Sequence, residues 1–350
     1  MRKTLATGLV ALAASPALAG GIERNPQSMA ILFQQGNYLE FGVAHARPRV
    51  SGTINLPPAQ GPSGNITRRF TTGSFAFKGE INDQLSYALI LDQPFGADTL
   101  YPLGTTLGGS SGKVENTMLT GVMRYKFDGG FSAYAGVRSS WTRGAVNLPF
   151  TGYSMTTDRD QAWGYLLGVA YEMPEIAMRV ALTYNSRIKH NFTANESPLP
   201  FTTSFTTNLP QSVNLEAQTG IAEGTLLFGS VRWVNWKDFN ISPSLAPDLV
   251  SYDRNSVTYT LGVGRRFNEN WSGSVSLAHD TGNGPETGNL GPVGKRNTLG
   301  LGVSYTMDAM TISAGVQYSR LGGVTTRLPV PSQFGSNSVI GAGIRIGYQF

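Results

Sequence analysis

The sequence predicts an all-β protein, a 14-stranded antiparallel transmembrane β-barrel with a short N-terminal plug segment. Apolar and polar residues alternate in runs of about ten residues along the whole chain, the length that a tilted strand needs to cross a bilayer. Short and long connections alternate strictly between these runs. Charged residues make up only 14% of the chain, well below the roughly 25% of soluble domains.

Residues 1–19 predict a secretory signal peptide. A basic start, Arg2 and Lys3, precedes an apolar run over 5–14 and a small-residue cleavage signal at 17–19. This apolar run is too short to span a membrane as a helix. We therefore expect an exported chain whose mature part begins at Gly20.

Residues 20–37 lie before the first predicted strand and are expected to form the plug segment inside the barrel. Met29, Ile31 and Phe33 are apolar although the lumen of such a barrel is polar. They would either contact an apolar ligand or pack the segment against the wall, and the sequence leaves both open.

The barrel itself is expected over residues 38–350. Successive side chains of a strand point to opposite faces, so an alternating run presents one face to lipid and the other to a wet lumen. The pattern is clear near the C-terminus, where small or polar residues separate an apolar series: Met310, Ile312, Ala314, Val316 and Tyr318.

Six connections are tight turns and seven are long, and thirteen connections join fourteen strands. The tight turns are NDQ at 82, DGG at 128, MPE at 173, AEG at 222, NEN at 268 and MDA at 307. The long connections are expected at about 51–69, 93–115, 148–159, 191–212, 239–254, 281–296 and 322–336. A barrel with short periplasmic turns and long outer loops explains this strict alternation, and both termini then face the periplasm.

The strand ends next to the tight turns are rich in aromatic residues, which predicts an aromatic girdle at the membrane interface. They are Phe127, Phe131, Tyr171, Phe267, Trp271, Tyr305, Tyr348 and Phe350. We expect strand 38–50 to close the barrel against strand 336–350, because an open edge is not tolerated in lipid. The terminal Phe350 resembles the signature that the bacterial barrel assembly machinery reads, which makes this machinery an expected partner.

Several stretches in order resemble the FadL/TodX type of outer-membrane long-chain fatty-acid transporters. Asn25-Pro26 stands where that family carries an Asn-Pro-Ala signature in its plug. The stretches YLEFGVAHARPRVSG, INDQLSYALILDQPFGADTLY, VRWVNWKDFNI and NENWSGSVSLAHDTGNGP are similar to the family's strands and turns. The resemblance covers most of residues 22–350. It departs in the plug, which usually has some forty residues, and in Gln27, which replaces the alanine of the signature.

The third predicted strand contains Asp92, Pro94 and Gly96. Pro94 cannot donate a ladder hydrogen bond, and Gly96 weakens pairing. The resemblance implies an interruption here that opens a lateral gap in the wall. The alternative is that Pro94 only ends the strand at its loop.

Strand parity places Arg124, Arg138, Arg179, Arg187, Arg345 and Glu172 in the lumen. A carboxylate ligand would prefer one or two of these arginines, with Arg138 as a candidate, since the guanidinium is a bidentate donor. Pairing of arginine and glutamate across the lumen is the alternative. On the long connection 191–210, Phe201 and Phe205 are candidates for a hydrophobic landing groove, or for packing between loops.

Other functional classes find little support in the residues. The chain has no cysteine and 3 histidines, without a clustered ligand spacing, so we expect no metal and no cofactor. The basic residues are dispersed, which argues against nucleic acid. His279 and Asp280 would face opposite sides of a strand and could not act together beside Ser274 or Ser276, so we expect no enzyme.

The resemblance implies passive uptake of hydrophobic molecules such as long-chain fatty acids across the bacterial outer membrane. Outer-membrane lipid and lipopolysaccharide would surround the barrel. A structural or adhesive surface protein and a general diffusion porin remain as alternatives.

Overall fold

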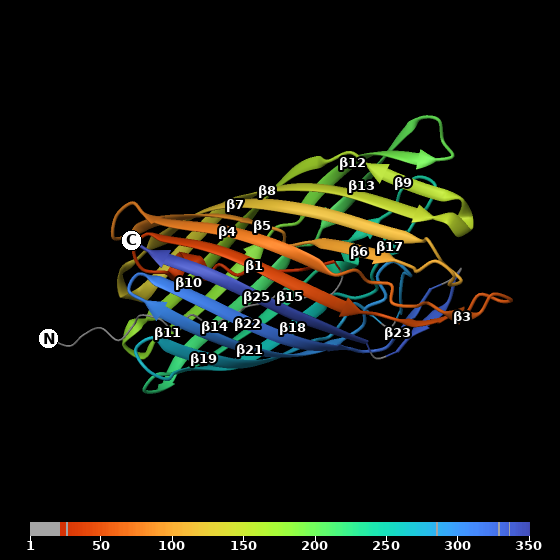
Figure 1. Cartoon of the computed structure of the whole chain (residues 1–350). Helices are drawn as coiled ribbons and strands as arrows, with labels where there is room; N and C mark the ends of the chain where they lie inside the picture. Colours follow the sequence, from red (N-terminus) through yellow and green to blue (C-terminus); the bar gives the residue numbers. More distant parts are fainter. Residues whose placement is uncertain (1–21, 26, 285, 328–329, 336) are drawn as a thin grey trace.

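The computed structural model describes residues 22–25, 27–284, 286–327, 330–335 and 337–350. Within these residues one antiparallel sheet closes on itself as a 14-stranded barrel (Figure 1), which confirms the predicted fold class. The predicted signal peptide and Pro26 lie outside the described residues. No helix among the described residues is long and apolar enough to cross a membrane.

The 14 strands of the barrel follow one another in chain order. We call each of them a stave, whether it consists of one hydrogen-bonded segment or of two. They are β1 (Tyr38–Arg49), β4 (Phe70–Glu80), β5 (Leu85–Asp92) with β6 (Gly96–Leu100), β7 (Ser111–Lys126), β8 (Phe131–Leu148), β9 (Tyr153–Thr157) with β10 (Asp160–Met173), β11 (Met178–Asn185) with β12 (Ile188–Ser197), β13 (Thr202–Leu209) with β14 (Ser212–Ala222), β15 (Thr225–Val234), β18 (Ser256–Arg266), β19 (Trp271–Asp280), β21 (Arg296–Met307), β22 (Met310–Leu321) and β25 (Asn337–Gln349). The sheet therefore has 18 hydrogen-bonded segments, because some staves are divided in two.

The first and last strands close the barrel as predicted. β1 pairs with β25 from Tyr38 opposite Gln349 to Arg49 opposite Ser338. The other edge of β1 pairs with β4. Phe41 and Val43, on the outer face of β1, are 52% and 60% exposed. Since lipid surrounds this face, their exposure is what a membrane barrel requires.

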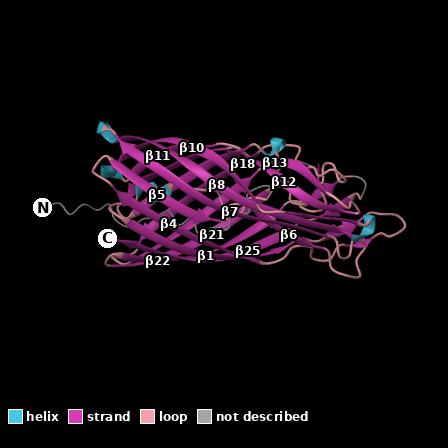
Figure 2. Ribbon diagram, turned by 90° about the horizontal axis from the view of Figure 1, so that it is seen from above, coloured by secondary structure: helices cyan, strands magenta, loops and turns pink. Residues whose placement is uncertain are grey.

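All six tight turns lie at one end of the barrel, and the long connections lie at the other (Figure 2). The turn between β7 and β8 shows why the sequence bends there, because Gly129 and Gly130 have φ angles of 75° and 85°. Such positive angles are costly for residues that carry a Cβ. The end with the tight turns is the periplasmic end, since short turns face the periplasm in outer-membrane barrels.

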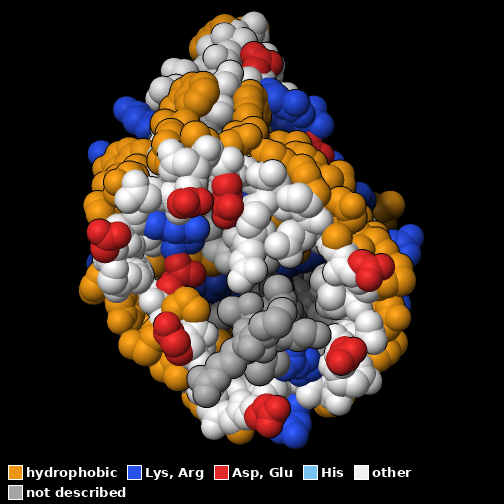
Figure 3. Space-filling model, turned by 90° about the vertical axis from the view of Figure 1, so that its left-hand side faces the viewer, with side chains coloured by type: hydrophobic (Ala, Val, Ile, Leu, Met, Phe, Trp, Pro, Cys, Tyr) orange, Lys and Arg blue, Asp and Glu red, His pale blue; other side chains and the backbone are white. Residues whose placement is uncertain are grey.

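The predicted aromatic girdle surrounds the periplasmic end. Phe131 contacts Tyr171 with ring centroids 4.7 Å apart, and Trp271 contacts Tyr305 at 4.8 Å. Seen from this end, the molecule has hydrophobic side chains on its flanks and charged side chains nearer its centre (Figure 3). The division between apolar flank and charged rim marks the membrane interface.

The long connections cover the outer end. β20 (Glu286–Thr287), β23 (Val324–Thr326), β24 (Ser332–Phe334), β2 (Gly52–Ile54) and β3 (Gly61–Pro62) form a separate 5-stranded sheet, and β16 (Asn240–Ile241) pairs with β17 (Val250–Ser251). Short 3-10 turns follow at Pro149–Thr151 and Trp236–Asp238.

The expectation of a loop over 191–212 is wrong for most of its length. β12 and β13 form a hairpin that extends the wall outward, pairing from Ile188 opposite Leu209 to Asn195 opposite Thr202. Buried and exposed residues alternate strictly along β12. The many Thr, Asn and Ser residues predicted a loop, but here they form the outer face of a β-ribbon that stands beyond the apolar band.

The segment before β1 runs inside the barrel. Its 3-10 turn η1 (Ala30–Phe33) buries Leu32 completely. Met29, Ile31 and Leu32 belong to one apolar cluster with wall residues of β4, β5, β7, β8, β10 and β11. The contacts of this segment determine the shape of the lumen.

Candidate functional site

The N-terminal segment is fixed at its periplasmic end by two arginines of the wall. The ring of Phe33 lies between the guanidinium groups of Arg124 and Arg179, at 4.4 and 4.5 Å from its centroid. Arg124 Nη1 also donates to the carbonyl oxygen of Leu32 at 3.0 Å. Arg124 pairs with Glu172 across the sheet. Phe33 is therefore held by two cation–π contacts.

Further along the lumen, the segment is held by buried polar contacts. Glu23, which is fully buried, forms an ion pair with Arg232 of β15. Arg138 of β8 donates to the side-chain oxygen of Gln27. Breaking a buried pair by removing one partner leaves an uncompensated charge and costs about 3–5 kcal/mol. These contacts fasten residues 22–33 to several staves at once.

The third stave is interrupted between Asp92 and Gly96. β5 pairs with β7 up to Asp92 opposite Met118, and pairing resumes in β6 with Gly96 opposite Glu115. Three residues of this stave thus oppose two of β7, the arrangement of a β-bulge. Pro94, Phe95 and Gly96 are all buried, so the extra length bends toward the lumen.

The interruption also leaves a gap in the hydrogen-bond ladder between this stave and β4, its neighbour on the side opposite β7. β4 pairs with β5 as far as Phe75 opposite Leu91. Contact resumes where the Arg68 N–H donates to the carbonyl oxygen of Asp98 at 3.2 Å. Among the described residues, no ladder hydrogen bond joins 70–74 to 92–97. We call this part of the barrel the wall gap.

The N-terminal segment pairs with the bent residues beside the wall gap. The Arg24 N–H donates to the carbonyl oxygen of Pro94 at 2.7 Å, and the Gly96 N–H donates to that of Ile22 at 2.8 Å. Asn25 Nδ2 donates to Asp92 Oδ2 at 3.1 Å. The segment thus supplies partners that the missing ladder would otherwise have supplied.

The side chain of Arg24 occupies the wall gap. Its Cζ lies 4.2 Å from the ring centroid of Phe70 on β4. On the other side of the gap, a Cβ added at Gly96 would lie 2.6 Å from the same Cζ. Glycine at 96 therefore leaves room for the guanidinium. Sequence reasoning did not identify Arg24, because neither its contact with Phe70 nor that with Gly96 is local in the chain.

An apolar cavity of about 130 Å³ lies against the wall gap and under the outer loops. Arg24, Phe70 and Gly96 line it on the side of the gap. The rest of its lining is largely apolar and comes from the β12–β13 hairpin and two outer connections, including Phe192, Phe205, Leu209, Phe239, Leu249 and Leu290. Such a cavity suits an apolar molecule of small cross-section.

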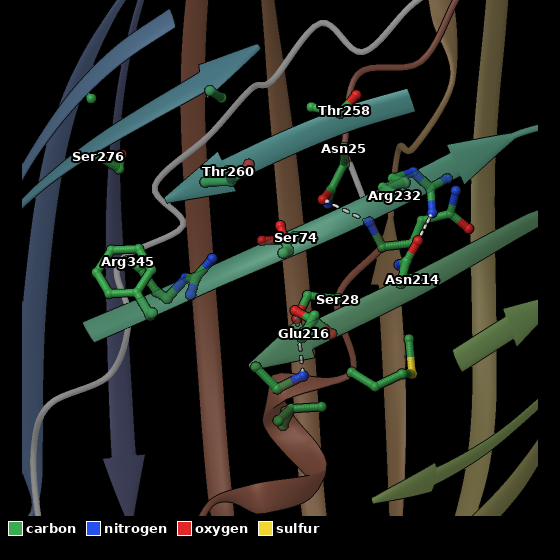
Figure 4. Close-up of a pocket in the computed structure, with 18 of the residues that line it drawn as sticks. Asn25, Ser28, Ser74, Asn214, Glu216, Arg232, Thr258, Thr260, Ser276 and Arg345 are labelled. Carbon is green, nitrogen blue, oxygen red and sulfur yellow. Dashed lines mark hydrogen bonds between the residues drawn. The ribbon is translucent and has the colours of Figure 1, made fainter. Parts of the chain in front are cut away.

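A second, polar cavity of about 370 Å³ lies in the lumen beside the N-terminal segment. Figure 4 shows its labelled side chains, with Ser28 of the segment and Glu216 of β14 turned toward each other. Ser28 Oγ donates to Glu216 Oε1 at 2.6 Å. Arg345 lines this cavity, with its Nε 3.3 Å from Glu40 Oε1. The lumen is thus polar near the middle of the barrel and apolar beneath the loops.

The remaining candidates from the sequence are distributed between these regions. Met29, Ile31 and Phe33 contact the wall and also line the polar cavity. Phe205 lines the apolar cavity, whereas Phe201 lies at the hairpin tip and is 63% exposed. Phe201 therefore does not line the apolar cavity, although Phe205 of the same hairpin does.

Arg187 does not face the lumen, contrary to expectation, and is exposed. The buried residues of β11 include Ala181, Thr183 and Asn185, but those of β12 begin at Ile188. One additional residue between the two strands shifts the parity, and such a shift reverses the face of every side chain that follows.

The structure contains a polar array that the sequence analysis missed. His190 Nδ1 lies 2.7 Å from Asp160 Oδ2, and its Nε2 lies 3.1 Å from Ser140 Oγ. The arrangement resembles a hydrolase triad, but Ser140 is fully buried and Asn116 Nδ2 donates to its oxygen at 2.8 Å. We interpret the array as a polar anchor between β8, β10 and β12.

The histidine considered in the sequence analysis has the expected orientation. His279 is exposed on the outer face and hydrogen-bonds Asn297, whereas Asp280 is buried and accepts from the Gly282 N–H at 2.8 Å. The two side chains do face opposite sides of β19.

Residues 4–327 match the family model described as "Outer membrane protein transport protein (OMPP1/FadL/TodX)". The chain belongs to this family. As a member of the OMPP1/FadL/TodX family, it is a transport protein of the bacterial outer membrane, and the family transports hydrophobic small molecules. No curated protein sequence matches it significantly.

Solved structures agree with the OMPP1/FadL/TodX fold. A FadL homologue from Pseudomonas aeruginosa superposes with a TM-score of 0.77 at 17% identity, covering 96% of this chain and 97% of that one. The Pseudomonas putida toluene transporter TodX gives 0.66 at 13% identity, with 96% and 98% covered. The Ralstonia pickettii toluene transporter TbuX gives 0.64 at 15% identity, with 96% and 97% covered. At these identities the likeness concerns the fold alone.

Proposed function

We propose that this family member takes up long-chain fatty acids, or molecules of similar shape and polarity, and releases them sideways through the wall gap into the membrane. The observation that carries the proposal is the contact between the apolar cavity and the wall gap, with Arg24, Phe70 and Gly96 lining both. A molecule in this cavity would reach lipid without passing through the polar cavity.

The energetics favour such a route for an apolar cargo. Exposing each methylene group to water costs about 0.8 kcal/mol. The path straight to the periplasm crosses the polar cavity with its arginines and glutamates, whereas the gap lies beside outward apolar residues such as Leu89 and Leu91. On the lateral route, a long acyl chain therefore exposes fewer methylene groups to water. The free-energy cost of leaving the barrel is smaller on this route than on the path to the periplasm.

The role of the N-terminal segment follows from the same contacts. We propose that residues 20–37 act as a plug whose part at Ile22–Asn25 controls the wall gap, with Asp92, Pro94 and Gly96 as the lateral opening. The pairing of Arg24 and Ile22 with the bent residues supports this role. Met29, Ile31 and Phe33 would then fix the plug, and Arg138 would position it through Gln27.

The alternatives are less well supported. A general diffusion porin needs an open aqueous path, but the segment is fastened across the lumen by contacts with β7, β8 and β15. An adhesive role has no specific observation in its favour. The family is a transport family, and we propose no catalytic function.

A crosslink across the wall gap tests lateral release. A bismaleimide joining Thr72→Cys to Gln93→Cys should strongly slow the uptake of a fluorescent fatty acid by cells that lack other transporters. The matched control joins Phe75→Cys to Leu91→Cys, a pair in the existing ladder of the same two strands, and should leave uptake unchanged. Full uptake with a locked gap and a folded barrel would show that the cargo passes straight to the periplasm.

A further inference from the structure

A cluster of arginines lies on the outer surface of the barrel, away from the lumen. Arg47 and Arg49 are on the exposed face of β1, and Arg69 precedes β4, the neighbouring strand. With Asn65, they line a cleft of about 290 Å³. We call this cleft, with its three arginines Arg47, Arg49 and Arg69, the arginine cleft.

The three arginines differ from other cations at the same rim. Arg68 Nε lies 3.8 Å from Asp98 Oδ1. Lys113 and Arg143 both form ion pairs with Glu115. In contrast, no acidic partner of Arg47, Arg49 or Arg69 is found among the described residues. Three adjacent guanidinium groups without a carboxylate repel one another, and an anion between them would relieve this repulsion.

The height of the cleft on the barrel indicates which anion it meets. Along the outer face of β1, the lipid-facing Phe41 and Val43 come first and the arginines follow toward the outer loops. On the adjoining strand, Ile340 and Ile344 are 56% and 57% exposed, opposite Arg47 and Val43 in the register. The cleft therefore lies directly beyond the apolar band, at the level of the outer headgroups.

We propose that the arginine cleft binds the phosphate groups of lipid A, the membrane anchor of lipopolysaccharide, in the outer leaflet. Guanidinium groups bind phosphate through paired N–H···O hydrogen bonds. The acyl chains of the same lipid would lie along Val43 and Ile344 beneath the cleft, with Ile340 beside Arg47 at its edge. The site is separate from the lumen, so it does not depend on which cargo the barrel carries.

Native mass spectrometry of the detergent-solubilised full chain with bisphosphorylated lipid A tests this site. The triple variant Arg47→Gln, Arg49→Gln, Arg69→Gln should weaken binding by at least about tenfold, because each basic residue at an anionic lipid surface contributes severalfold to affinity. The matched control is Lys126→Gln, Arg265→Gln, Arg266→Gln, which removes the same charge near the periplasmic turns and should change affinity by less than about twofold.

Further arms identify the ligand and guard against misfolding. Lipid A stripped of its phosphates should bind the wild-type barrel as weakly as it binds the triple variant, and inorganic phosphate alone should not compete at equal concentration. If the triple variant does not fold, as judged by heat-dependent gel migration, the single variants Arg49→Gln and Arg69→Gln must each weaken binding. Equal losses in both triple variants, or undiminished binding without phosphates, would overturn the proposal.

Discussion

At the scale of single residues, Glu196 shows how one carboxylate organises the outer end. It is buried near the tip of the β12–β13 hairpin. Its oxygens accept from Tyr153 Oη at 2.9 Å and from the backbone N–H groups of Ser244 and Leu245 at 3.1 and 3.0 Å. The hydroxyl of Thr203 also donates to it. Glu196 thus joins β9, the hairpin and the connection after β15.

Protonation of Glu196 should loosen this connection. Burial alone would raise its pKa, but hydrogen bonds from Thr203, Leu245, Tyr153 and Ser244 outweigh burial and lower the pKa below the ordinary 4.5. A lowered folded pKa contributes stability that is present above the unfolded value and is lost as pH falls through the folded one. We expect hydrogen exchange over 239–250, corrected for intrinsic rates, to accelerate below about pH 4.5.

The Glu196→Gln variant provides the control. Its amide can present only one acceptor oxygen and leaves a backbone donor without a partner, which costs roughly 1–3 kcal/mol of local stability. Exchange over the same connection should be fast already at neutral pH and should show no further acceleration on acidification. An unchanged exchange rate in Glu196→Gln would mean that other contacts hold this connection.

At the scale of elements, the strands show which irregularities matter. The interruption between β5 and β6 bends a segment inward, and the irregularity between β11 and β12 reverses the faces of the side chains beyond it. The closing strand β25 is regular throughout its pairing with β1 and β22. Phe350, which follows β25, donates its N–H to the carbonyl oxygen of Asn37 at 3.0 Å.

Deleting Phe350 should reduce assembly in the outer membrane more than it reduces the stability of the assembled barrel. Phe350 is 59% exposed and contacts Tyr348, with ring centroids 6.0 Å apart, so it contributes little buried surface. We expect less heat-modifiable barrel in membranes at equal synthesis, and a nearly unchanged unfolding midpoint for barrel refolded in detergent. Normal insertion in cells would argue against recognition of Phe350 by the assembly machinery.

At the scale of the whole molecule, the barrel combines a closed wall, an internal segment and a covered outer end. The segment is fastened near both of its described ends, by Phe33 between two arginines and by Glu23 on Arg232. The β12–β13 hairpin and the connections that follow β15 and β19 line the apolar cavity at this outer end. We therefore expect the intact protein to conduct ions poorly.

Planar bilayers test this expectation directly. Deleting residues 22–35 removes the segment together with Glu23 and Phe33, and should raise the single-channel conductance severalfold. The Phe33→Ala variant is a milder control, since it removes only the contact with Arg124 and Arg179 and should give brief openings on a low background. A large steady conductance of the intact protein would favour the general diffusion porin instead.

The sequence by itself determined the wall of this protein. Period-two alternation, tight turns and an even strand number are local properties, and they predicted the closure of β1 on β25 and the girdle around Trp271 and Phe131. For the third stave the local pattern left two outcomes open, because a proline without an N–H can either interrupt a ladder or end the strand at its loop.

Only the tertiary structure decided what the irregularities do. The prediction that Arg187 faces the lumen assumed an unbroken two-residue period. One additional residue between β11 and β12 reverses this period, and the pattern of apolar and polar residues did not show where that residue lies. Arg24 reaches Phe70, and Glu23 reaches Arg232, because closing the sheet brings distant staves around one internal segment. Strand period is a property of neighbouring residues, whereas the contents of the lumen depend on how all the staves are arranged around it.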